Sequence, residues 1–128
     1  HAQKVSRANT ARVKATLYLR ETVEVAVDFS QATSSWNSQI LKPECQSPSL
    51  CHPVAGGSSW TLANGNESVE PGYDRSLTFA LVLRDPITGN ISDTGLPDLD
   101  TKKVVASLNW NDGFGLRTAT LETYLYKP

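Results

Sequence analysis

The stretch AQKVSRANTARVKATLYLRETVEVAVD, residues 2–28, decides the fold because it contains neither Pro nor Gly and is rich in helix-favouring residues. Apolar or small residues recur along it at every third or fourth position, which predicts one helix with a single apolar face. At about 1.5 Å per residue this helix would be roughly 40 Å long. We therefore expect one of its ends to protrude from the domain that follows. The residues of the face are Val5, Ala8, Ala11, Ala15, Leu19, Thr22 or Val23, and Ala26.

The predicted apolar face changes in character along the helix. Its first half is rich in Ala, whereas the second half carries larger apolar side chains such as Leu19 and Val23. This gradient predicts that the second half packs against a sheet and that the first half contacts a neighbour outside the domain. The alternative is an ordinary amphipathic helix whose first turn is frayed.

Length and charge exclude several classes of protein. The chain has 128 residues, a net charge of -1 and a pI of about 6.1, so we expect one domain without bulk attraction to polyanions. Direct nucleic-acid binding is therefore not expected. No run of about 18 apolar residues is present that would span a bilayer. The sequence also lacks Met, and we expect a processed or truncated chain in which His1 is foreign.

Cys45 and Cys51 are the only cysteines, with QSPSL between them. An isolated pair favours a disulfide and an exported protein, and closing so short a loop contributes about 2–3 kcal/mol. The alternatives are a metal site or a nucleophile. A structural zinc site needs four ligands, and His52 is the only other candidate ligand close by. Adjacent side chains such as Cys51 and His52 rarely face each other, so we expect no catalysis and no enzyme.

Residues 29–57 are rich in Ser, Pro, Gln and Asn. This composition predicts a long irregular connection, closed by the two cysteines, which is a candidate interaction surface. Trp36 lies within this polar stretch, so of the three tryptophans it is the candidate for an exposed side chain that contacts a partner, and packing in the core is the alternative.

From residue 58 to residue 128 the sequence alternates between apolar and polar residues, as in β-strands. The clearest hairpin joins two alternating runs, residues 103–110 and 118–125, through a loop that contains NDGFG. One long helix followed by strands predicts an α+β domain, in which the helix packs on an antiparallel sheet.

Acidic side chains crowd the connection that precedes this hairpin. Asp93, Asp98 and Asp100 supply oxygen ligands that calcium prefers, so this loop is a weak candidate for a calcium site. The sequence does not fit the EF-hand pattern, and ordinary turn and capping roles are the alternative.

Two segments resemble one family. RVKATLYLRETVEVAVDF, residues 12–29, is similar to the later part of the first helix of type IV minor pilins and type II pseudopilins, with matching spacing at Ala15, Leu19, Glu21 and Glu24. VVASLNWNDGFGLRTATLETYLYK, residues 104–127, is similar to the last hairpin of the same proteins.

The resemblance implies a structural subunit of an extracellular filament, without catalytic activity or cofactor. Such a subunit is anchored in the inner or cytoplasmic membrane before assembly, through an apolar segment preceding Ala2. It then assembles with other pilin subunits through the helix and displays its head for adhesion, motility or DNA uptake, or for a host or surface ligand. The implied stem residues are Val5, Ala8, Ala15, Leu19, Glu21 and Glu24. The alternative is a free secreted carbohydrate- or protein-binding module.

Overall fold

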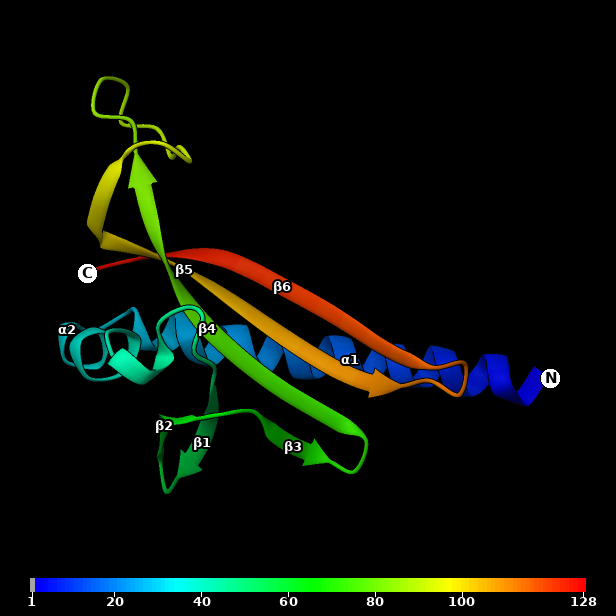
Figure 1. The fold of residues 1–128 in the computed structure, drawn as a ribbon. Helices are drawn as coiled ribbons and strands as arrows, with labels where there is room; N and C mark the ends of the chain where they lie inside the picture. Colours follow the sequence, from blue (N-terminus) through cyan, green and yellow to red (C-terminus); the bar gives the residue numbers. More distant parts are fainter. Residues whose placement is uncertain (1) are drawn as a thin grey trace.

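The computed structural model describes residues 2–128, with side chains described from Ser6 onward. A 28-residue helix, α1 (Ala2–Phe29), is followed by short helical turns and a six-stranded antiparallel sheet. Figure 1 shows α1 running along one face of this sheet. The predicted α+β class, with a helix on an antiparallel sheet, is confirmed. The remaining elements are α2 (Thr33–Ser35), a π-helical turn (Trp36–Ile40), a 3₁₀ turn (Pro43–Cys45), β1 (Cys51–Gly56), β2 (Ser59–Asn64), β3 (Glu67–Glu70), β4 (Tyr73–Arg84), β5 (Leu96–Asn111) and β6 (Leu116–Tyr126).

The sheet has the strand order β2-β1-β4-β5-β6, and β3 pairs with β4 beside β1. The predicted hairpin is present as β5 and β6, whose turn contains Gly113 and Gly115 at positive φ. Phe79 of β4 is opposite Val104 of β5, which is opposite Thr123 of β6. Since side chains alternate along each strand, this register turns the apolar set of β4 and β5 toward α1.

Two groups of buried residues hold α1 to the sheet. The first, here called the large cluster, surrounds the second half of α1 and includes three aromatic residues. The second, here called the small cluster, lies under the first half of α1. The large cluster consists of Val25, Ala26, Phe29, Trp36, Ile40, Cys45, Cys51, Leu62, Leu77, Phe79, Val104 and Leu125; the small cluster consists of Ala11, Ala15, Leu19, Ala106, Leu108 and Trp110.

The segment between α1 and the sheet is more ordered than its composition predicts. Three short helical turns occupy it, and β1 begins at Cys51, within the stretch predicted to be an irregular loop. The strand escapes recognition because Pro53 interrupts the sequence pattern. Pro53 is tolerated there because β1 pairs with β4 only at Cys51 and is otherwise bonded on one side, to β2.

The prediction that Trp36 is exposed is wrong, because its side chain is 0% exposed. Trp36 and Ile40 are four residues apart on one helical turn and both face the large cluster. The polar residues between them, Asn37 and Ser38, are exposed and cover the outside of the turn. The polar neighbours of Trp36 therefore indicate that the outside of this turn is exposed, but they do not indicate whether the tryptophan side chain is exposed.

Candidate functional site

The inner face of α1 is covered by the sheet of the same chain. Ala15 and Leu19, two of the expected stem residues, are buried in the small cluster against Ala106, Leu108 and Trp110. These two side chains are therefore unavailable for contacts between subunits, contrary to the expectation. Ala8 is half-buried, and Val5 lies outside the residues whose side chains are described.

The outer face of α1 is open. Val13 and Leu17 lie near the middle of the helix, and their side chains are 60% and 58% exposed. Val27 is also exposed further along the same helix. Exposed apolar side chains grouped on one element often mark a contact surface. The apolar side chains of the second half of α1 are therefore divided: some are buried in the core, and others are exposed on the outer face of the helix.

A set of polar contacts, here called the polar clamp, ties one flank of α1 to β3 and β4. Lys14 Nζ lies 3.2 Å from Glu70 Oε2, and the Tyr18 hydroxyl donates to the other oxygen of Glu70. The buried Arg75 donates through Nη1 to Glu21 at 2.6 Å and through Nε to Glu67 at 2.7 Å. Glu21, expected in the stem, is therefore part of this clamp.

The hydrogen bonds of the polar clamp shift the pKa values of two of its residues, Glu70 and Tyr18. Hydrogen bonds donated by Tyr18 and then by Lys14 lower the pKa of Glu70, because they favour the charged carboxylate. Donating that hydrogen bond to Glu70 raises the pKa of Tyr18, since the carboxylate stabilises the protonated hydroxyl. We therefore expect the contribution of the polar clamp to stability to depend on pH both in acid and in alkali.

Next to the clamp, a groove separates the second half of α1 from β2. It has a volume of about 290 Å³ and is lined by Glu21, Glu24, Val25, Asp28 and Trp60. Glu24 and Asp28 are exposed and make no ion pair within the described part of the chain. Carboxylates beside the ring of a tryptophan suit a cationic group such as a guanidinium. Glu24, also expected in the stem, therefore lies on an acidic flank.

The predicted disulfide is present. Cys45 and Cys51 are bonded, with their Cα atoms 5.2 Å apart, and both are fully buried in the large cluster. Neither sulfur is available as a metal ligand or a nucleophile. His52 Nδ1 lies 2.8 Å from the carbonyl oxygen of Gly65, so this histidine bridges backbone segments.

The acidic residues proposed for calcium do not assemble. Asp98 is occupied by Arg84 at 2.6 Å and by Thr101 at 2.7 Å, and these hydrogen bonds lower its pKa to about 2. Asp93 lines a different pocket, described below, and Asp100 is exposed. Over residues 2–128 the structure brings together no three His, Cys, Asp or Glu side chains that could hold a metal ion.

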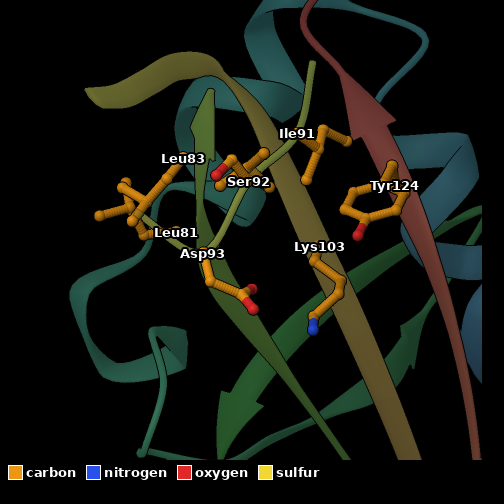
Figure 2. Close-up of a pocket in the computed structure, with 8 residues that line it drawn as sticks. Leu81, Leu83, Ile91, Ser92, Asp93, Lys103 and Tyr124 are labelled. Carbon is orange, nitrogen blue, oxygen red and sulfur yellow. The ribbon is translucent and has the colours of Figure 1, made fainter. Parts of the chain in front are cut away.

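Sequence reasoning missed a pocket on the opposite face of the sheet. The segment after β4 folds back, with Ile91 bridged to Arg84, and its residues 91–93 line a pocket together with residues of β4, β5 and β6. The pocket has a volume of about 170 Å³, and Figure 2 shows Asp93, Lys103 and Tyr124 at its edge. Strand alternation places Lys103 and Tyr124, which are paired, on this face, but only the loop makes it concave. Its complete lining is Leu81, Val82, Leu83, Ile91, Ser92, Asp93, Lys103 and Tyr124.

The described helices include none that is long and apolar enough to cross a membrane. Comparison with family models, curated proteins and solved structures finds no match to this chain. The assignment of a function therefore depends on the geometry and on the sequence resemblance.

Proposed function

We propose that this chain is the head and stem of a structural subunit, a minor pilin or pseudopilin, in a type IV pilus-like filament. One observation carries the proposal: α1 exposes Val13 and Leu17 on the face that points away from its own sheet. In addition, the N-terminal turns of α1 extend past the turn between β5 and β6 (Figure 1). A helix that is half covered by its own domain and half open suits packing against other helices of the same kind.

The rest of the molecule suits display on a cell surface. The buried disulfide is typical of an exported protein. We infer that an apolar segment preceding Ala2 anchors the subunit in the inner or cytoplasmic membrane before assembly. The assembled head then faces outward for adhesion, motility or DNA uptake, and the net charge of -1 disfavours direct DNA capture.

No catalytic role is proposed. The described histidine, His52, contacts a backbone carbonyl, and both cysteine sulfurs are bonded to each other. A nucleophile would need a base within hydrogen-bond reach, and neither group offers one.

A free secreted binding module is the second candidate. The observation that favours it is the pocket of about 170 Å³ beside Tyr124, where apolar walls meet an ammonium and a carboxylate. A small ligand with an apolar body and polar ends would fit such a lining.

Mass spectrometry of filaments sheared from the surface of the native cell distinguishes the two candidates. We expect peptides of this chain in the filament fraction, together with a peptide that joins Ala2 to an upstream apolar segment. Recovery of the chain only from the culture medium, without such a segment, contradicts the filament role. Ligand screening against the pocket would then be the next step.

A further inference from the structure

The charges on α1 are separated along its length. Residues 2–20 contain five basic and no acidic residues, whereas residues 21–41 contain three acidic and no basic residues. This order opposes the usual preference for acidic side chains at a helix N-terminus and basic side chains at its C-terminus. Stability of the isolated helix therefore does not account for it. The basic residues are Lys4, Arg7, Arg12, Lys14 and Arg20, and the acidic residues are Glu21, Glu24 and Asp28.

Arg12 and Glu21 also project from different sides of α1. Glu21 is bonded to Arg75 on β4, whereas the guanidinium of Arg12 lies 5.9 Å from the ring centre of Trp110 on β5. Nine residues separate Arg12 from Glu21, and at about 100° per residue they project from opposite flanks of the helix. Arg20 is exposed on the outer face and makes no ion pair within residues 6–128.

The spacing of the arginines and that of the acidic residues differ by only one position. Arg12 and Arg20 are eight residues apart, and Glu21 and Asp28 are seven residues apart. Two helices that point the same way and are displaced by eight or nine residues, about 12–14 Å, would place Arg12 beside Glu21 and Arg20 beside Asp28. Without that displacement only Arg20 would be level with an acidic residue, Glu21, and Arg12 would have no acidic residue beside it.

We call the side of α1 that carries Arg12 and Arg20 the arginine flank, and the groove lined by Glu21, Glu24 and Asp28 the acidic groove. From this pattern we infer that the acidic groove of one copy receives the arginine flank of a second copy, with both α1 helices parallel and displaced by about 12–14 Å. The inference rests on the proposed filament function and specifies its contact. A guanidinium that enters the groove gains carboxylate partners and lies beside Trp60. Glu21 can take part although it binds Arg75, because its side chain is still 49% exposed.

A second copy fits better than an unrelated partner because the same helix supplies both halves of the contact. One flank of each copy is used in each contact, so the other flank remains open for the next copy. Such a heterologous contact continues without closing, as a filament requires. An antiparallel pair would instead use the same flank twice and close as a dimer.

Disulfide cross-linking within filaments tests the inference. We would introduce Arg20→Cys and Asp28→Cys together into the full-length protein, in which the native cysteines are already bonded to each other. The two new positions are eight residues apart on one helix, about 12 Å, so they cannot bridge within a chain. Oxidation of sheared filaments is expected to produce a ladder of cross-linked oligomers. Dimers alone would indicate a closed pairing and overturn the inference.

Arg7 provides the matched control. It is also a basic, exposed residue of α1 without an ion pair in the described chain, but it projects on the clamp side with Lys14 and Glu21. The pair Arg7→Cys with Asp28→Cys is expected to produce no ladder. A ladder of equal intensity would mean that the register is wrong.

Charge exchange supplies a second readout. Arg20→Glu is expected to lower the yield of sheared filaments about tenfold, because like charges would meet across the contact. Adding Asp28→Arg to that variant is expected to restore the yield. If wild-type filaments contain this chain but neither cross-linking nor charge exchange behaves as stated, the inference fails and the filament function stands. If the chain is absent from filaments, the proposed function is wrong, and the inference that rests on it is wrong as well.

Discussion

The large cluster and the small cluster hold the same helix to the same sheet by different means. The large cluster buries Trp36, Phe79, Ile40 and a disulfide, whereas half of the six residues in the small cluster are alanines. The small cluster is supplemented by the charged contacts of the polar clamp. The second half of α1 is therefore fixed by buried apolar volume, and the first half depends more on polar groups that respond to pH and charge.

The largest effect should come from removing the central side chain of the large cluster. Trp36→Ala is expected to lower the free energy of unfolding by about 3–5 kcal/mol, measured by chemical denaturation. Trp36→Phe should cost much less, since the indole N–H has no hydrogen-bond partner in the described chain. As a counterpart in the small cluster, Ala11→Gly should cost only about 1 kcal/mol. Equal losses at Trp36 and Ala11 would remove the distinction between the clusters.

The disulfide should have the next largest effect. Replacing both Cys45 and Cys51 by Ala is expected to cost about 2–3 kcal/mol, because the unfolded chain loses a constraint. The measurement is again denaturant unfolding, with and without a reductant. Reductant should destabilise the wild type by a similar amount and leave the double variant unchanged. A wild type that reductant does not affect would show that the bond is not present or not needed.

The polar clamp should contribute less than either of these. Arg75→Met leaves Glu21 and Glu67 without their shared cation, and we expect a loss of about 2 kcal/mol. This figure is below that for fully buried pairs because Glu21 is half-exposed. Adding Glu21→Gln and Glu67→Gln should recover part of the loss. Amide hydrogen exchange should rise mainly in residues 6–20, and uniform exchange along α1 would contradict a local role.

The smallest effect is a dependence on pH that is confined to the clamp. The lowered pKa of Glu70 means that its contribution is present above the ordinary value of 4.5 and disappears as pH falls through the lowered folded-state value. The raised pKa of Tyr18 works in the opposite direction: its contribution is present below the ordinary value of 10.0 and disappears as pH rises through the raised value.

Unfolding free energies between pH 3 and pH 11 check this prediction. Glu70→Gln should reduce the loss of stability in acid, and Tyr18→Phe should reduce the loss in alkali. The disulfide-free variant should keep both dependences, because the large cluster does not include these groups. Unchanged profiles in the two clamp variants would show that the clamp does not respond to pH.

Features with a local cause could be predicted from the sequence. The helix follows from the period of its apolar residues, and the β5–β6 hairpin from strand alternation around two glycines. The disulfide follows from an isolated pair of cysteines. By contrast, the burial of Trp36 could not be predicted because its sequence neighbours are polar, and β1 could not be predicted because Pro53 interrupts its pattern.

The parts of the candidate site that could not be predicted depend on contacts between distant residues. Arg75 meets Glu21 across 54 positions of sequence, and Tyr18 meets Glu70 across 52. The pocket beside Tyr124 exists only because a loop folds back over the sheet. For the same reason, the spacing of Asp93, Asp98 and Asp100 along the chain did not show that Arg84 would occupy Asp98.

The charge order along α1 also gives this helix an electric dipole. Its positive end lies at the helix N-terminus, where the aligned peptide groups already place partial positive charge, so the two contributions add. Parallel dipoles that lie level with each other repel, whereas an axial displacement brings unlike ends together and turns the repulsion into attraction. Since mobile ions screen charges over about 8–10 Å at ordinary salt concentrations, this selection operates mainly between immediate neighbours. Ionic strength would thus determine how strictly copies of this chain keep one register.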